Sequence, residues 1–182
     1  MAKYKCINLD QYYNNCGFTK REEIHKGNLT VFKTSFPLEE GFELFPDYKG
    51  VPLKFNKYND NDNIELEGQK IFLDQYYKVK RIYIVGLSIY GDYFDDFNLY
   101  KNNQLVQNIR VKLTGTDSKV PSFGNEMLLR YTSLHNAKKG KLNISSTIWL
   151  DEIDLEQPRI IDSIELGDNP CMHIFSITLE II

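Results

Sequence analysis

The strongest constraint on the fold is an alternation of apolar and polar side chains that recurs along the chain in short runs. Residues 108–115 read Asn-Ile-Arg-Val-Lys-Leu-Thr-Gly, which places Ile109, Val111 and Leu113 on one side of an extended backbone. Because successive side chains of a β-strand point to opposite faces, this run predicts a strand with one buried and one solvated side. Residues 172–182 carry apolar side chains along a whole face, which predicts a C-terminal strand docked in the core.

Similar runs, separated by turn residues such as Asn102-Asn103, fill most of the 182-residue chain. They give about nine predicted strands, at 3–9, 28–34, 51–55, 63–73, 81–90, 108–115, 142–150, 159–166 and 172–182. No window of ten or more residues follows the 3.6-residue period of a helix, and the best short helical candidates are 38–45 and 125–130. We therefore expect one all-β domain over residues 1–182, an antiparallel β-sandwich of the jelly-roll type with little helix.

Composition and charge narrow the range of partners. Aromatic residues make up 13% of the chain, and such side chains favour strands and wet binding surfaces. The net charge of -3 is spread along the sequence without a basic stripe, so we expect no nucleic acid partner. The N-terminus has no apolar leader, and no segment approaches the length of a membrane span. We therefore expect no membrane partner and a cytoplasmic location.

A series of motifs occurs in a recognisable order along the chain. The motifs are Tyr-Asn-Asn-Cys-Gly-Phe at 13–18, Val-Pro-Leu-Lys-Phe at 51–55, and the runs 62–71, 85–91, 149–155 and 163–179. In this order they resemble an accessory β-sandwich domain of bacterial carbohydrate-active proteins. The resemblance covers nearly the whole chain and implies a galactose-binding-like jelly roll, usually beside a glycoside hydrolase domain, that contacts carbohydrate or packs against the catalytic unit. It carries over no catalytic residue. The chain departs from the family pattern at 98–103, where Tyr-x-Asp-Gly is usual, and the Trp expected soon after is missing.

A saccharide site needs a flat aromatic ring beside amide, carboxylate or hydroxyl groups. Candidates at or beside predicted strand ends and loops are Trp149, Tyr131, Tyr90 and Tyr93, with Asp92 and His135 near them in sequence. Packing inside the sandwich is the alternative for each ring. Asn14 and Asn15 are further candidate ligand-binding residues. For these two, a tight turn is the alternative, because Asn tolerates the left-handed backbone conformation.

Residues 59–63, Asn-Asp-Asn-Asp-Asn, form the densest cluster of oxygen ligands in the sequence. Such groups bind calcium, so Asp60 and Asp62 are candidate ligands of a structural calcium ion, and the sequence suggests no other cofactor. The loop lacks the glycine and the twelfth-position glutamate of an EF-hand. A solvated turn is the alternative, since Asn and Asp also initiate hairpin turns.

Signatures of nucleotide, acyl-transfer or kinase chemistry are absent from the sequence, and its three His and three Cys show no metal-binding spacing. We therefore expect a non-catalytic module that binds carbohydrate or accompanies carbohydrate-active proteins. A protein-interaction or assembly module, acting as a homodimer or with a partner chain, is the alternative. The third hypothesis is a small hydrolase or isomerase acting on a sugar, which requires two carboxylates or a His to converge in one pocket. An acidic loop with Asp92, Asp95 and Asp96 offers candidates for this role.

Overall fold

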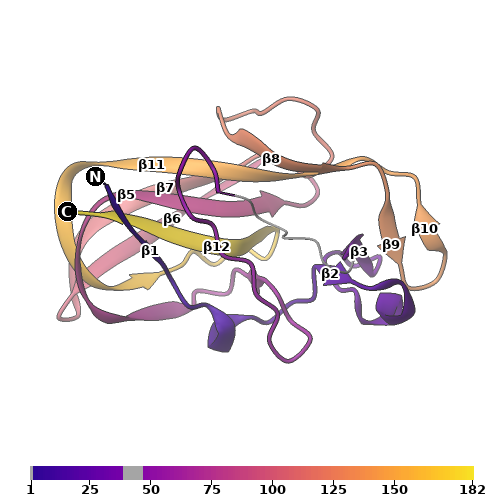
Figure 1. Cartoon of the computed structure of the whole chain (residues 1–182), viewed down its shortest axis with the longest axis horizontal. Helices are drawn as coiled ribbons and strands as arrows, with labels where there is room; N and C mark the ends of the chain where they lie inside the picture. Colours follow the sequence, from indigo (N-terminus) through magenta and orange to yellow (C-terminus); the bar gives the residue numbers. More distant parts are fainter. Residues whose placement is uncertain (1, 39–46) are drawn as a thin grey trace.

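The computed structural model describes residues 2–38 and 47–182, and its regular structure is almost all β (Figure 1). The strands are β1 (Lys3–Cys6), β2 (Phe18–Thr19), β3 (Thr34–Pro37), β4 (Ile64–Glu65), β5 (Lys70–Ser88), β6 (Tyr93–Lys101), β7 (Gln104–Leu113), β8 (Glu126–Tyr131), β9 (Leu134–Asn136), β10 (Gly140–Leu142), β11 (Ser146–Glu165) and β12 (Met172–Ile181). In the same residues two short 3-10 helices occur, η1 (Asp10–Tyr12) and η2 (Arg21–Lys26). No helix in these two ranges has the length and apolar character needed to cross a membrane. The expected all-β fold with little helix is confirmed.

The strands form two sheets. In the larger sheet β1, β12, β5, β11, β6 and β7 are adjacent in that order, while β4 pairs with β12 and β8 with β11. The smaller sheet contains β10, β9, β3 and β2 in that order. All pairings between these strands are antiparallel except that of β2 with β3. Figure 1 places the smaller sheet at one end of the molecule and both chain termini at the other.

The two longest strands, β5 and β11, pair with each other at the centre of the larger sheet. Their register shifts between Asp154 and Arg159, which flank Pro158. Proline lacks the N–H that a ladder needs, and within strands it is tolerated at such bulges. The predicted strands 142–150 and 159–166 therefore lie largely in one continuous strand.

Two clusters of buried side chains form the core. The first belongs to the larger sheet and includes Phe97 of β6 and Ile164 of β11. The second includes residues of both sheets and is rich in aromatic rings. In the second, the ring of Phe18 lies 5.2 Å from that of Phe36 and 5.4 Å from that of Phe175. Burial of each such side chain contributes about 1.5–3 kcal/mol, so this cluster joins the small sheet firmly to the large one.

Several predicted elements differ from the observed ones. Segment 125–130, a predicted helix, is extended and forms most of β8, because pairing with β11 outweighs its local pattern. The acidic stretch with Asp95 and Asp96, interpreted as a loop, lies in β6. The predicted strands 28–34 and 51–55 are mostly irregular. The other predicted helix, 38–45, lies outside the described residues except at its first position.

Candidate functional site

Trp149 and Tyr131, two of the predicted ligand-binding residues, pack in the aromatic-rich cluster. Trp149 has no exposed surface, and its indole Nε1 donates a hydrogen bond of 3.2 Å to the carbonyl oxygen of Gly115. The half-buried Tyr131 lies with its ring 5.0 Å from that of Phe36. Because a fully buried ring has no face to stack on a sugar, Trp149 is corrected from a ligand-binding residue to a core residue.

The next three candidates do not converge on a common site. Tyr90 is exposed just beyond β5, and its hydroxyl accepts a hydrogen bond of 3.0 Å from the N–H of Val31. Tyr93 packs against the core of the larger sheet. Asp92 accepts a hydrogen bond of 2.7 Å from the N–H of Gly115, which gives it a structural role between two loops.

Asn14, Asn15 and His135 each bridge separate segments of the chain. The Nδ2 of Asn14 donates to the carbonyl oxygen of Glu65 at 3.0 Å, and its Oδ1 accepts from the N–H of Glu65 at 2.7 Å. The buried Asn15 donates to the carboxylate of Glu65 at 3.1 Å. The Nδ1 of His135 lies 2.9 Å from the hydroxyl of Thr19, and burial lowers the pKa of this imidazole. These contacts give both asparagines structural roles, but neither residue has the positive φ angle of the predicted tight turn.

The fold divides the predicted calcium loop. Asn59 and Asp60 have positive φ angles of 49° and 70° and form the centre of a turn closed by two hydrogen bonds between Tyr58 and Asn61. Asn and Asp adopt this conformation more readily than other residues with a Cβ. Asp60 is exposed at the turn, whereas Asp62 is fully buried. No group of three or more His, Cys, Asp or Glu side chains in the described part of the chain could hold a metal ion.

Asp62 and His173 belong to a buried polar network between β2 and β12. The Asp62 carboxylate accepts hydrogen bonds from the N–H groups of Gly17 and Phe18 at 2.8 and 2.9 Å. Asn63 donates to the same carboxylate at 2.9 Å, and its Oδ1 lies 2.8 Å from the Nδ1 of His173. Burial raises the pKa of Asp62 to about 6 and lowers that of His173 to about 3. His173 is therefore a neutral core imidazole at physiological pH.

This neutral imidazole predicts an effect of acid on stability. Below about pH 6.5, the pKa of histidine in an unfolded chain, the unfolded state binds a proton that the folded state does not. The stability that neutral His173 contributes is therefore lost as the pH falls towards its folded pKa of about 3. Asp62 has the opposite effect: folding raises its pKa to about 6, so its contribution to stability increases as the pH falls. The pH dependence of wild-type stability therefore combines the two contributions.

The difference in unfolding free energy between wild type and His173→Gln removes the contribution of Asp62, because Asp62 is present in both proteins. We expect this variant to be less stable than wild type at neutral pH and the difference in unfolding free energy to shrink as the pH is lowered. Urea unfolding at a series of pH values measures this difference. A difference that stays constant across the series would contradict a neutral, buried His173.

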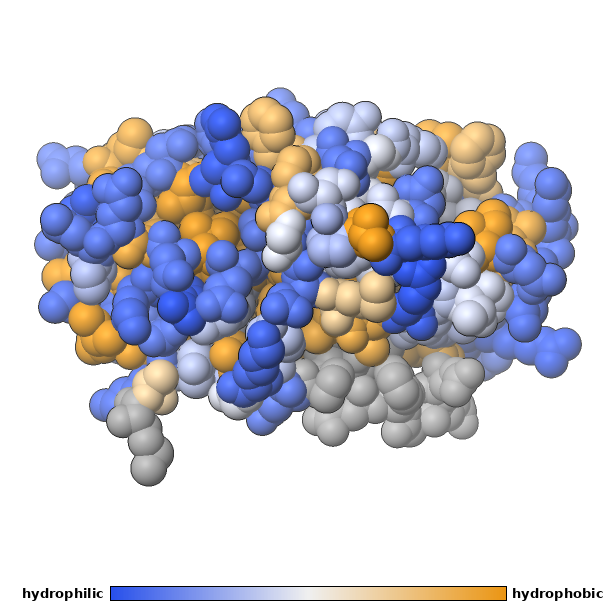
Figure 2. Space-filling view, turned by 90° about the horizontal axis from the view of Figure 1, so that it is seen from above, coloured by the Kyte–Doolittle hydropathy of each residue, from blue (hydrophilic) through white to orange (hydrophobic). Residues whose placement is uncertain are grey.

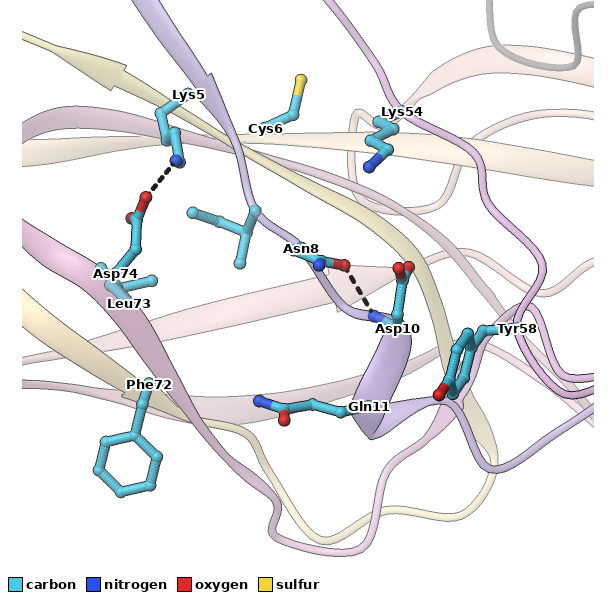
Figure 3. Close-up of a pocket in the computed structure, with 11 residues that line it drawn as sticks. Lys5, Cys6, Asn8, Asp10, Gln11, Lys54, Tyr58, Phe72, Leu73 and Asp74 are labelled. Carbon is cyan, nitrogen blue, oxygen red and sulfur yellow. Dashed lines mark hydrogen bonds and ion pairs between the residues drawn. The ribbon is translucent and has the colours of Figure 1, made fainter.

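A hollow of about 710 Å³ lies where β1, η1 and the start of β5 meet (Figure 3). Its walls come from three stretches of sequence: Lys5, Cys6, Ile7, Asn8, Asp10 and Gln11; then Lys54 and Tyr58; then Phe72, Leu73 and Asp74. The first stretch is held at the edge of the larger sheet because β1 pairs with β12. The hollow thus combines polar and aromatic side chains that are far apart in the sequence.

Local hydrogen bonds fix the wall of the hollow that contains η1. The N–H of Asp10, the first residue of η1, donates to the Oδ1 of Asn8 at 3.1 Å. Asn56 donates to the carboxylate of Asp10 at 2.6 Å. Figure 3 shows the ring of Tyr58 beside Asp10, where the turn that follows Tyr58 holds it. Tyr58 is 50% exposed, so much of its ring is open to solvent.

An ion pair forms the opposite wall. The Nζ of Lys5 lies 2.6 Å from the Oδ2 of Asp74 (Figure 3). The hydroxyl of Tyr77 donates a hydrogen bond to the Oδ1 of Asp74 at 2.8 Å. The hydrogen bond to Asp74 raises the pKa of Lys5, and the hydrogen bond from Lys5 lowers the pKa of Asp74. Asp74 is therefore ionised at neutral pH and lacks the raised pKa of a general acid in glycoside hydrolysis.

Several polar groups of the hollow have no partner among the described residues. They are the Nδ2 of Asn8, the side-chain amide of Gln11, the Nζ of Lys54 and the hydroxyl of Tyr58. In Figure 3 the Nζ of Lys54 points towards Asn8 and Asp10. The arrangement supplies donors and acceptors around a space beside an exposed aromatic ring. Such a site is suited to binding a small polyhydroxylated molecule.

The sequence-based candidates include none of these residues. Two signals were present: the polar residues Asn8, Asp10 and Gln11 at the end of a predicted strand, and Tyr58 immediately before the turn residues Asn59 and Asp60. Neither signal indicates that the two segments meet, because their proximity depends on the pairing of β1 at the sheet edge.

The two sheets define an all-β sandwich, and the hollow on it is open and lined by polar and aromatic side chains. Comparison with protein families matches residues 3–181 to the AziU2-like beta-sandwich domain. The chain belongs to this family. A comparison with curated proteins gives no match. The β-sandwich inferred from the sequence motifs is confirmed, while the link to carbohydrate-active proteins stays a prediction.

Proposed function

We propose that the chain is a non-catalytic β-sandwich module that binds a saccharide in the hollow between β1, η1 and the start of β5. The observation that carries this proposal is the presence, in one hollow, of exposed aromatic rings and unpartnered amide, ammonium and hydroxyl groups. A pyranose stacks its C–H face on an aromatic ring and directs its hydroxyls to such polar groups. The volume of about 710 Å³ lies within the range typical of small-ligand sites.

The side chains of the hollow have distinct roles in this proposal. The ring of Tyr58 stacks on the sugar, and the free amide groups of Asn8 and Gln11 bind its hydroxyls. Lys54 donates a further hydrogen bond across the hollow. Phe72, on the other side of the hollow in Figure 3, extends the apolar surface for a second sugar unit.

Binding fits these residues better than hydrolysis does. A glycosidase needs a carboxylic acid that stays protonated near neutral pH, and the pKa of Asp74 is shifted in the opposite direction. The carboxylate of Asp10 already accepts a hydrogen bond from Asn56. We therefore propose recognition of the saccharide without its cleavage.

Titration with a panel of mono- and disaccharides, followed by amide NMR shifts, tests the proposal. We expect a saturable shift with at least one sugar at millimolar concentration, confined to residues around the hollow. Replacing Tyr58 with alanine removes the stacking ring, so we expect binding about tenfold weaker.

A matched control is Phe94→Ala, because Phe94 is 52% exposed, lies on β6 and is not part of the hollow. This variant is expected to bind the sugar as wild type does. Shifts with none of the sugars, or an equal loss of affinity in both variants, would exclude the hollow as a saccharide site.

A further inference from the structure

A second surface lies at the end of the molecule that carries the smaller sheet (Figure 1). The turn before β3 exposes two adjacent apolar side chains, Val31 at 76% and Phe32 at 69%. Single exposed apolar residues are common on soluble proteins, whereas a cluster of them marks an interaction surface. Ile144, also exposed, borders the same hollow as Val31 and Phe32.

The backbone of this turn is fixed by side chains from distant segments. The N–H of Val31 donates to the hydroxyl of Tyr90 at 3.0 Å, and the Nδ2 of Asn136 donates to the carbonyl oxygen of Phe32 at 2.7 Å. The N–H of Lys33 closes the turn with a hydrogen bond of 2.8 Å to Thr30. A surface ordered before binding loses less conformational entropy when a partner arrives.

The hollow beside the turn has a volume of about 630 Å³ and combines apolar and positively charged walls. Its lining residues are Val31, Phe32, Lys33, Thr34, Asn136, Lys138, Lys139, Leu142 and Ile144. Three of these nine are lysines and none is acidic, although the whole chain has a net charge of -3. Lys138 and Lys139 form no ion pair with a described residue. Figure 2 shows hydrophobic patches next to hydrophilic side chains at this end of the molecule.

One of the strands that line this hollow ends the smaller sheet. β10 is the last strand in the order β10, β9, β3 and β2, so its outer edge has no neighbour in the described structure. An edge strand offers backbone N–H and C=O groups to an extended chain. Leu142 of β10 lines the hollow, and Lys141 is exposed beside it.

We propose that this surface binds an extended segment of another protein in which acidic residues flank a large apolar side chain. The segment pairs with β10, its apolar side chain enters the hollow between Phe32 and Ile144, and its acidic residues meet Lys138, Lys139 and Lys141. The lysines select the charge of the partner, and the edge strand selects an extended backbone, which a lipid surface does not supply. This surface is separate from the saccharide hollow and does not depend on it.

A displayed library of random peptides, selected against the full chain, tests the proposal. We expect enrichment of peptides with an apolar residue between Asp or Glu residues. A synthetic copy of an enriched peptide, measured by fluorescence anisotropy, should bind the Phe32→Ala variant about tenfold more weakly than wild type. The double variant Lys138→Glu, Lys139→Glu should lose affinity to a similar degree, and added salt should weaken binding to wild type.

Two variants serve as controls. Leu105→Ala removes an apolar side chain of β7 that is 57% exposed and lies outside the hollow, so peptide affinity should be unchanged. Tyr58→Ala should also bind the peptide normally, because the saccharide hollow is a different site. Failure of sugar binding together with retained peptide binding would reject the proposed function and leave this inference intact.

Four results would overturn the inference. A selection that enriches no peptides, or basic peptides alone, would remove the charge complementarity with the lysines. An acidic peptide that binds Phe32→Ala as tightly as wild type would remove the apolar contact. Reversible self-association of wild type that Phe32→Ala abolishes would identify a second copy as the occupant. Binding to anionic phosphatidylserine vesicles, lost in Phe32→Ala and without any peptide binding, would identify a membrane.

Discussion

Replacing Trp149 with alanine is expected to lower the free energy of unfolding by about 3–5 kcal/mol. The indole is fully buried in the aromatic-rich cluster, so its removal leaves a cavity that the neighbouring rings fill only in part. The carbonyl oxygen of Gly115 also loses the hydrogen bond from Nε1. Urea unfolding monitored by circular dichroism measures the change.

Phe94→Ala is the control for this experiment, because Phe94 is an exposed aromatic residue of another strand. Phe94→Ala should lower the free energy of unfolding by less than about 1 kcal/mol. If Trp149→Ala were as stable as this control, the indole would not belong to the core. The large expected loss also means that Trp149→Ala does not test ligand binding, since any loss of affinity would follow from damage to the fold.

Asp62→Ala is expected to lower the free energy of unfolding by about 2–4 kcal/mol, the second largest effect. Without the carboxylate, the buried N–H groups of Gly17 and Phe18 have lost their acceptor. Each buried donor left without a partner lowers the stability of the fold by about 1–3 kcal/mol. Part of this loss is offset, because the variant no longer has to bury the charge of Asp62. The measurement is again urea unfolding at neutral pH.

Asp60→Asn is the matched control, two positions away in the same sequence cluster, because Asn removes the charge and still tolerates the positive φ angle of 70°. Asp60 is exposed, and its ion pair with Lys26, at 3.0 Å, is of the surface type that contributes about 0–1 kcal/mol. Equal losses in the two variants would contradict the division of the loop into an exposed turn and a buried anchor. A fall in the melting temperature of wild type on adding a calcium chelator would instead support the calcium interpretation.

The alternation of side chains predicted the strands that have one clearly buried face. β7 and β12 fall close to the predicted ranges, because a period of two residues is a local property that the sequence displays directly. β6 was not predicted, since Asp95 and Asp96 interrupt its apolar pattern and only Phe97 and Leu99 of this strand are fully buried. Its identity as a strand depends on its neighbours β7 and β11, which are contributed by other parts of the chain.

The position of a binding residue was harder to predict than the position of a strand. Phe97 and Tyr58 have similar local surroundings in the sequence, an aromatic residue between two polar ones, yet Phe97 is buried and Tyr58 is half exposed. Burial depends on which distant segments pack over a ring, and no local pattern encodes that contact. The same reason explains why Asn8 and Lys54 were not grouped before the fold was known.

The pairing of β1 with β12 brings residues near the two ends of the described chain together, with Lys3 directly opposite Ile181. An affinity tag or surface anchor attached at either end therefore leaves the molecule from the same side, away from the smaller sheet (Figure 1). Immobilised in this way, the protein presents the turn with Val31 and Phe32 to the solution. The same proximity permits a short linker between the ends and a new opening at the exposed Asn102-Asn103 turn, which yields a circular permutant with both sheets intact.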